Sequence, residues 1–182
     1  MPEGARVLLV LGGSLGARQV NELIAEALPR LAGRVFVIHQ TGGGWPALPD
    51  TPWYVSQPYF STEMPDLYAG ADLIFGRAGA GTLWEAAAAR VPLVLLPLSA
   101  GSRGDQVRNA ALFEARGAAR VFRVPPEETS ERTAERLSQA VETFLGDEGA
   151  LARARSALAD LEAAGAAGRI ADDLLAREAR RV

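Results

Sequence analysis

The stretch RVLLVLGGSLGARQVN, residues 6–21, decides the fold of this chain. Its first six residues form a largely apolar run, which is typical of a strand buried on both faces. Two glycines close the run, and apolar residues with helical spacing follow over residues 17–31. A buried strand that passes through a glycine-rich turn into a helix is the opening unit of a parallel sheet covered by helices.

The same unit recurs along the chain. The pattern predicts further strands at residues 34–39, 53–56, 72–75, 93–96 and 119–122, and helices at residues 64–69, 80–90 and 105–116. From residue 130 the sequence is helical, with interruptions near Gly146 and Gly165. We therefore expect an α/β fold, a Rossmann-like parallel sheet with helices on both faces. Residues 1–182 would form a single domain with a helical tail from about residue 130.

Composition excludes several classes of protein. The chain has 182 residues, a net charge of -3, one His and no Cys. Disulfides and thiolate zinc sites are therefore excluded, and no metal site is expected. No basic cluster favours nucleic acid as a partner. The longest apolar run, residues 91–98, is too short to span a bilayer, and no signal peptide is recognisable, so we expect a cytoplasmic protein.

Right-handed crossovers place the loops that follow parallel strands along one edge of the sheet. Three loops are then of interest, at residues 12–16, 76–82 and 99–105. In the first, glycines allow close approach of a ligand, and the start of a helix offers amides and a positive dipole end to phosphate. Ser14 would either donate to that anion or cap the helix.

A nicotinamide dinucleotide is poorly supported as the ligand. Its fingerprint begins with a glycine where this chain has Leu11. The fingerprint also needs an acid at the end of the second strand, where this chain has His39 and Gln40.

The second loop introduces a carboxylate, Glu85, near the start of a helix. The spacing of Thr82 and Glu85 fits a capping box, which by itself would account for the acid. Alternatively, the carboxylate accepts hydrogen bonds from the two hydroxyl groups of a ribose.

The third loop carries Asp105, Gln106 and Asn109 within one helical turn. Their spacing brings amide and carboxylate groups onto a common face, which suits a polyhydroxylated ring. The alternative is that Asp105 caps the helix and the amides face solvent.

Several motifs in this order resemble one family. These motifs are GGSLGARQVN at 12–21, HQTG at 39–42, YFSTEM at 59–64, GRAGAGTLWEAAAARVPLVLLPL at 76–98 and GDQVRNA at 104–110. Together they resemble the MurG-type UDP-N-acetylglucosamine transferases, which add the second sugar to lipid-linked muramyl-pentapeptide in peptidoglycan synthesis. The resemblance runs from about residue 6 to residue 122.

The resemblance implies the C-terminal, donor-binding half of a two-domain GT-B glycosyltransferase. The implied activity is inverting transfer of N-acetylglucosamine from UDP-N-acetylglucosamine (UDP-GlcNAc), with no cofactor and no obligatory metal. The lipid I acceptor, the general base and the membrane contact would belong to a missing N-terminal half. Membrane contact by this chain would therefore be indirect, and this chain alone would transfer sugar negligibly.

The resemblance also implies roles for particular residues. The donor-binding residues would be Gly13, Ser14, Gly16, Phe60, Ser61, Gly79, Thr82, Glu85, Asp105, Gln106 and Asn109. The glycine loop with Ser14 would meet the diphosphate, and Glu85 would bind the ribose. Phe60 would cover the uracil ring while the backbone at Ser61 reads its edge, and the last three residues would hold the sugar hydroxyls. Arg77 and His39 are expected to be structural, and no catalytic residue is expected in this half.

Three other functions stay open at this level. A UDP-sugar epimerase would need acid and base residues, for which only His39 is a candidate. A natural half-subunit, of this or another lipid glycosyltransferase, would need a partner for its acceptor site. A nucleotide-sensing module would bind UDP without preference for a sugar.

Overall fold

Six parallel strands form one sheet in the computed structural model, which describes residues 1–13, 17–46, 48–98, 104–161 and 165–179. The strands are β1 (Arg6–Leu11), β2 (Val35–Gln40), β3 (Tyr54–Gln57), β4 (Leu73–Gly76), β5 (Leu93–Leu95) and β6 (Ala119–Val121). Each predicted strand is present, with its ends displaced by no more than one residue.

The strand order is β3-β2-β1-β4-β5-β6, the Rossmann order with β1 in the middle. β1 pairs with β2 on one side, where Leu8 lies opposite Val37, and with β4 on the other, where Leu8 lies opposite Leu73. The chain runs outward from β1 in one direction and then returns to add β4 on the opposite side. A crevice is therefore expected where the loops after β1 and β4 diverge.

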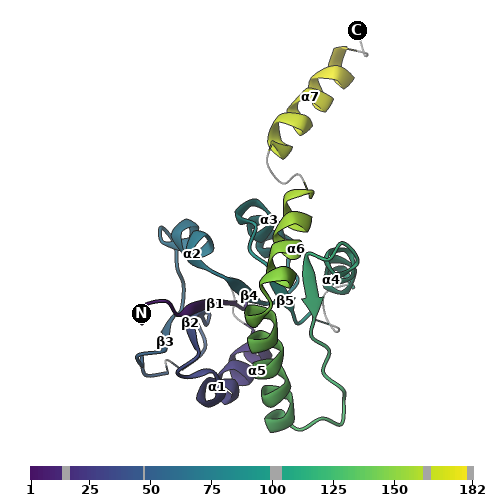
Figure 1. Cartoon of the computed structure of the whole chain (residues 1–182). Helices are drawn as coiled ribbons and strands as arrows, with labels where there is room; N and C mark the ends of the chain where they lie inside the picture. Colours follow the sequence, from purple (N-terminus) through teal and green to yellow (C-terminus); the bar gives the residue numbers. More distant parts are fainter. Residues whose placement is uncertain (14–16, 47, 99–103, 162–164, 180–182) are drawn as a thin grey trace.

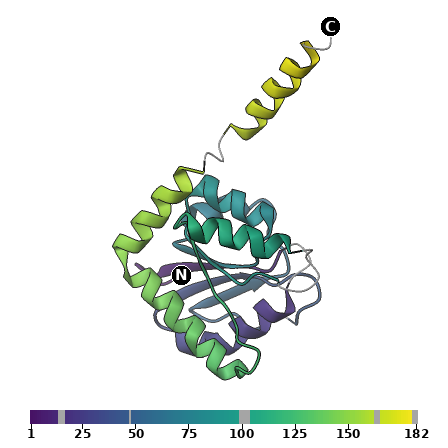
Figure 2. The same ribbon diagram turned by 90° about the vertical axis from the view of Figure 1, so that its right-hand side faces the viewer.

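Helices cover both faces of the sheet (Figures 1 and 2). α1 (Arg18–Leu31) and α5 (Ser130–Gly146) lie together on one face. α2 (Met64–Gly70), α3 (Ala80–Ala89) and α4 (Asp105–Ala115) lie on the other. The fold class predicted from the strand and helix pattern is thus confirmed.

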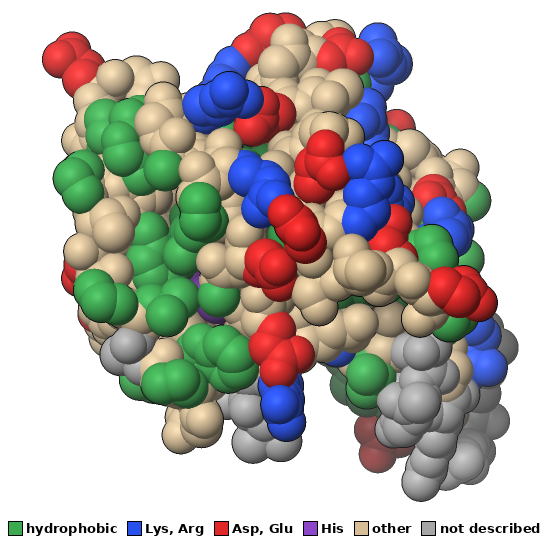
Figure 3. Space-filling model, turned by 90° about the horizontal axis from the view of Figure 1, so that it is seen from below, with side chains coloured by type: hydrophobic (Ala, Val, Ile, Leu, Met, Phe, Trp, Pro, Cys, Tyr) green, Lys and Arg blue, Asp and Glu red, His purple; other side chains and the backbone are tan. Residues whose placement is uncertain are grey.

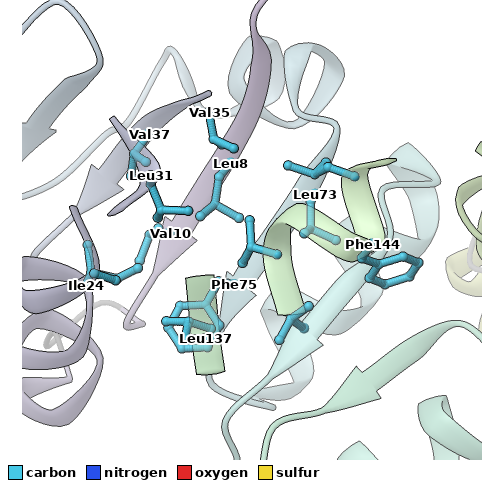
Figure 4. Close-up of a cluster of buried hydrophobic side chains, with 14 of the residues drawn as sticks. Leu8, Val10, Ile24, Leu31, Val35, Val37, Leu73, Phe75, Leu137 and Phe144 are labelled. Atoms are coloured by element: carbon cyan, nitrogen blue, oxygen red, sulfur yellow. The ribbon is translucent and has the colours of Figure 1, made fainter. Parts of the chain in front are cut away.

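Each face of the sheet has its own apolar core, because alternate residues of a buried strand point to opposite sides. Figure 4 shows the first core, in which side chains from β1, β2 and β4 meet those of α1 and α5. Its labelled members are Leu8, Val10, Ile24, Leu31, Val35, Val37, Leu73, Phe75, Leu137 and Phe144. The second core joins Leu9, Ile74 and Leu93 to Leu83 of α3 and Phe113 of α4.

The helical region after residue 130 is more than a tail. α5 contributes buried residues to the first core, and α6 (Glu148–Ala159) crosses from one face to the other. Leu151 of α6 belongs to the first core, whereas Leu158 belongs to the second. Among the described helices, only α7 (Ala166–Ala179) projects away from the sheet (Figures 1 and 2), with Ile170 and Leu174 more than 60% exposed.

A glycine fixes the contact between the two central strands. A Cβ atom added to Gly76, the last residue of β4, would lie 2.1 Å from the backbone oxygen of Leu11 at the end of β1. Since that neighbour is backbone, it has no side-chain freedom with which to move away. Gly76 therefore allows the ends of β1 and β4 to approach closely at the crevice.

The surface mixes acidic and basic side chains. On the face seen from below, apolar side chains gather on one side, and charges of both signs are interspersed elsewhere (Figure 3). Across the described ranges, no helix is both long enough and apolar enough to cross a membrane.

Candidate functional site

A pocket opens at the crevice between the carboxyl ends of the central strands. It has a volume of about 420 Å³ and takes residues from four separate segments of the chain. The lining residues are Leu11, Gly13, Gln40, Tyr59, Phe60, Ser61, Met64, Tyr68, Gly81, Thr82 and Glu85. Five of the eleven residues predicted to bind a donor, namely Gly13, Phe60, Ser61, Thr82 and Glu85, are thus brought together here.

The pocket begins where β1 ends. Gly13 has φ of +85°, a left-handed conformation that is strained for any residue with a side chain. This glycine turns the chain at the crevice toward the start of α1. Ser14 and Gly16, the other two predicted residues of this loop, lie outside the described residues.

The helices that begin at this edge have no side-chain cap among the described residues. The N-cap of α1 is Ala17 and that of α3 is Gly79, and neither start is capped by a side chain. By contrast, Thr129 caps α5 and Asp147 caps α6 through their side chains. Within the described ranges, the N-terminal amides of α1 and α3 therefore have no side-chain cap at the crevice. The N-cap of α1 is Ala17, and the capping alternative for Ser14 falls on a residue outside the described ranges.

Glu85 does not form a capping box. α3 begins at Ala80, so Thr82 is its third residue rather than its cap, and Glu85 lies almost one turn further along. The Glu85 carboxylate instead accepts a 2.8 Å hydrogen bond at Oε2 from the hydroxyl of Tyr68. Its other oxygen, Oε1, has no hydrogen-bond partner within the described part of the chain, so it is available to a ligand.

Another part of the pocket lining comes from the segment after β3. Phe60 is buried with 6% exposure, and its N–H donates to the side-chain oxygen Oε1 of Gln40 over 3.0 Å. Gln40 occupies the end of β2, where dinucleotide folds place their ribose-binding acid. Here that position holds Phe60 in place, which leaves Glu85 as the carboxylate lining the pocket. The N–H of Ser61 donates to Glu63 over 3.1 Å.

Asp105, Gln106 and Asn109 of the third predicted loop are not among the residues that line this pocket. Residues 99–103 of that loop lie outside the described residues. The Asn109 side-chain amide donates to the Ala78 oxygen over 3.1 Å, which ties α4 to the loop after β4. The Gln106 side-chain oxygen accepts from the Leu98 N–H over 3.0 Å. Asp105 pairs with Arg108 at 2.5 Å. Asp105 does not cap α4, because the N-cap is Gly104, which precedes it.

Arg77 is a buried cation at the same edge. Its guanidinium donates to the Leu96 oxygen and to the Gln19 side-chain oxygen, each over 3.0 Å. Both acceptors are neutral, and burial lowers the pKa of this guanidinium from its ordinary value. The residue links β4, the segment after β5 and α1, so the prediction of a structural role is supported. It also leaves a positive charge near the crevice that no described carboxylate neutralises.

His39 is likewise structural. It is fully buried, with one ring nitrogen 3.1 Å from the Tyr54 hydroxyl and the other 3.1 Å from the Asn21 side-chain oxygen. Burial lowers the pKa of His39 to about 4. The Asn21 amide continues the network to the Thr41 oxygen over 2.8 Å, which joins α1 to the loop after β2.

Six lining residues are not in the predicted set, namely Leu11, Gln40, Tyr59, Met64, Tyr68 and Gly81. Two of them, Gln40 and Tyr68, form hydrogen bonds to predicted site residues. In the sequence, Gln40 is notable only because it stands where the dinucleotide fingerprint needs an acid. Tyr68 carries no signal except its place in a short predicted helix, and its contact with Glu85 is visible only in three dimensions.

Comparison with known proteins agrees with this geometry. Residues 7–170 match the glycosyltransferase family 28 C-terminal domain. The chain is 40% identical, over 130 residues, to a UDP-N-acetylglucosamine--N-acetylmuramyl-(pentapeptide) pyrophosphoryl-undecaprenol N-acetylglucosamine transferase of Treponema denticola. That match covers 64% of this chain and 33% of the relative, so the chain spans about a third of the length of such relatives.

Solved structures show the same likeness. The crystal structure of Acinetobacter baumannii MurG matches with a TM-score of 0.66 and 28% identity, over 86% of this chain and 46% of that one. The calicheamicin glycosyltransferase CalG4 matches with a TM-score of 0.78 and 23% identity, over 98% and 45% of the two chains. The fold is that of one half of a GT-B glycosyltransferase. Since the family match covers most of its length, this chain belongs to the glycosyltransferase family 28 C-terminal domain family.

Proposed function

We propose that this chain is the donor-binding half of an inverting glycosyltransferase that moves N-acetylglucosamine from UDP-GlcNAc to lipid-linked muramyl-pentapeptide. One observation carries the proposal. Gly13, Phe60, Thr82 and Glu85, which come from three separate segments, line a single pocket at the switch point of a Rossmann-like sheet.

The chemistry of the pocket fits a nucleoside diphosphate. The N-termini of α1 and α3, which no described side chain caps, offer backbone amides and positive dipole ends to the phosphates. The buried guanidinium of Arg77 adds a positive charge nearby. On the other side, the free oxygen of Glu85 is suited to accept from a ribose hydroxyl, and Phe60 offers an apolar ring beside the base.

The proposed reaction uses this charge distribution. The hydroxyl of the acceptor attacks the anomeric carbon of N-acetylglucosamine, and the bond between that carbon and the diphosphate oxygen breaks. The electron pair of that bond leaves with UDP, and the helix amides and Arg77 stabilise its negative charge without rearranging. The base that removes the proton of the acceptor hydroxyl would lie in the other half of the enzyme.

Gly79, Asp105, Gln106 and Asn109 would complete the donor site from its rim. The side-chain oxygen of Gln106 accepts from Leu98, and the side-chain nitrogen of Asn109 donates to Ala78, so each amide has one polar atom bonded within the protein. The other polar atoms, Nε2 and Oδ1, are suited to the hydroxyls of a sugar. Ser14 and Gly16 would contact the diphosphate from the glycine loop.

The name of a relative supports the proposed acceptor. The Treponema denticola protein is named for transfer to N-acetylmuramyl-(pentapeptide) pyrophosphoryl-undecaprenol, which is a lipid-linked acceptor. We propose that an N-terminal half supplies the acceptor groove and the contact with the cytoplasmic face of the membrane. No metal or cofactor is part of the proposed reaction, and this half alone should turn over negligibly.

Isothermal titration calorimetry of this chain with UDP-GlcNAc, UDP-glucose and NAD tests the proposal. We expect binding of UDP-GlcNAc, weaker binding of UDP-glucose and none of NAD. Glu85→Ala should weaken UDP-GlcNAc binding by about 1–3 kcal/mol, because a ribose hydroxyl loses its acceptor. Glu135→Ala, which removes an exposed carboxylate of α5 paired with Arg132, is the matched control and should change nothing.

The outcomes separate the rival functions. Tight binding of NAD, or no binding of UDP-GlcNAc, would contradict the proposal. Equal binding of UDP and both UDP-sugars would favour a nucleotide-sensing module. An epimerase is disfavoured already, since His39, its acid-base candidate in the sequence, is buried and occupied at both ring nitrogens.

A further inference from the structure

Tyr68 of α2 contacts Glu85, the one carboxylate among the described residues that line the pocket. Its side chain is 6% exposed and packs in the second core, and its hydroxyl donates to Glu85 Oε2 over 2.8 Å. The contact joins two helices, at positions 17 residues apart in the chain. The phenol lies in the pocket lining together with Thr82 and Glu85, so any ligand of Glu85 lies next to it.

Glu85 has little else to hold it. It lies on the exposed side of α3 and neither caps the helix nor forms an ion pair with any described residue. An exposed glutamate samples many rotamers, and fixing it in one costs free energy. The hydrogen bond from Tyr68 fixes the Glu85 side chain in the folded protein before a ligand binds, so ligand binding does not have to supply that free energy.

Because Tyr68 is the donor of this hydrogen bond, it occupies only one of the two carboxylate oxygens of Glu85. A phenol has one proton, and this proton is donated to Oε2. Burial first, and then Glu85, raise the pKa of the Tyr68 phenol, so it keeps its proton at neutral pH. One oxygen of Glu85 is therefore anchored, while Oε1, which has no hydrogen-bond partner among the described residues, stays available as an acceptor.

We propose that Tyr68 is a positioning residue, which holds the Glu85 carboxylate in the orientation that accepts the ribose hydroxyls of the donor and so makes the site selective for ribonucleotides. This inference rests on the proposed function, since it assigns the ribose preference of that same site to a residue outside the predicted set.

Tyr68→Phe isolates this role, because it removes one oxygen and keeps the ring in the core. Calorimetry would compare UDP with 2′,3′-dideoxy-UDP, which lacks both ribose hydroxyls. In the unmodified chain UDP should bind more tightly than the dideoxy compound. In Tyr68→Phe the affinity for UDP should fall about tenfold, which corresponds to the free energy of fixing one glutamate side chain. The affinity for the dideoxy compound should stay the same.

Tyr54→Phe is the matched control. It also removes a buried hydroxyl with a hydrogen-bond partner, His39, but Tyr54 is not part of the pocket wall. It should lower the melting temperature and leave the preference for UDP over the dideoxy compound unchanged. A purely structural role for Tyr68 would make the two variants behave alike.

A double-mutant cycle gives a second readout. Once Glu85→Ala has removed the carboxylate, adding Tyr68→Phe should change UDP affinity less than twofold, because the two residues act as a unit. Equal tenfold effects in both backgrounds would overturn the inference, as would an unchanged ribose preference in Tyr68→Phe. If the unmodified chain binds UDP without ribose preference, the inference fails but nucleotide binding stands. If it binds no UDP, both fail.

Discussion

Replacing Gly76 with alanine should destabilise the protein, because the added methyl group would collide with backbone of the neighbouring strand. The new Cβ would lie 2.1 Å from the Leu11 oxygen, whereas ordinary van der Waals contacts begin at 3.4 Å. β1 and β4 would therefore have to separate by about 1.3 Å at their carboxyl ends. The two strands are paired in this register, and the Arg77 N–H donates to the same Leu11 oxygen over 3.3 Å.

The expected change in the free energy of unfolding is the balance of two destabilising effects and one stabilising effect. Overpacking costs about 1–3 kcal/mol, and weakening one backbone hydrogen bond adds about 1 kcal/mol. Alanine also reduces the conformational freedom of the unfolded chain, which stabilises the folded state by about 0.4–1 kcal/mol. We expect a net loss of about 1–3.5 kcal/mol in the free energy of unfolding. For a chain of this size, the melting temperature should fall by about 2–14 °C.

Urea unfolding at 25 °C, followed by circular dichroism, measures this change directly. Gly146→Ala is the matched control, because a Cβ at this position in the last turn of α5 meets no atom within 4 Å. Alanine there should leave the stability unchanged or raise it by up to about 1 kcal/mol. If Gly76→Ala unfolds at the same urea concentration as the unmodified chain, the close approach of β1 and β4 is refuted.

Two further predictions concern stability. His39 has a pKa of about 4 when folded and about 6.5 when unfolded, so the unfolded chain binds more protons and stability falls as the pH falls below 6.5. Between pH 7 and pH 5, the free energy of unfolding of the unmodified chain should fall by about 2 kcal/mol more than that of His39→Gln, as measured by urea unfolding. Equal decreases in the two proteins would contradict the burial of a neutral imidazole. Deleting residues 165–182 should change the free energy of unfolding by less than about 0.5 kcal/mol, because the described side chains of α7 are exposed. A larger loss in the same assay would mean that α7 packs against the rest of the domain.

The fold could be predicted because its signals are local. A strand buried on both faces must be apolar at nearly every position, as in β1, and a covering helix must repeat its apolar residues at helical spacing, as in α1. Glycines mark the turns between them. These rules need no knowledge of the partner element, so the predicted boundaries lie close to the observed ones.

The region after residue 130 shows the limit of such signals. Its sequence has a clear helical pattern, yet the pattern does not say which surface a helix covers. α5 packs with α1 against one face of the sheet, and α6 crosses to the other face. These placements depend on shapes built by distant parts of the chain.

Capping was the least predictable feature. Thr82 and Glu85 have the right spacing for a capping box, but the box needs Thr82 to be the N-cap. The helix starts earlier, because Gly79 provides the N-cap. A one-residue error of the same kind affects Asp105, which follows the cap Gly104. Spacing alone cannot decide where the first helical turn begins.

By itself, the sequence determined the order and kind of the elements, the edge of the sheet where the pocket opens, and several of the residues that line it. Each of these follows from periodicity, glycine placement, the handedness of crossovers and short motifs, which are properties of neighbouring residues. Only the tertiary structure decided what each polar group contacts. Tyr68 reaches Glu85, Gln40 holds Phe60 and Arg77 spans three elements, because hydrogen bonds form between groups that folding brings within about 3 Å, whatever their separation along the chain.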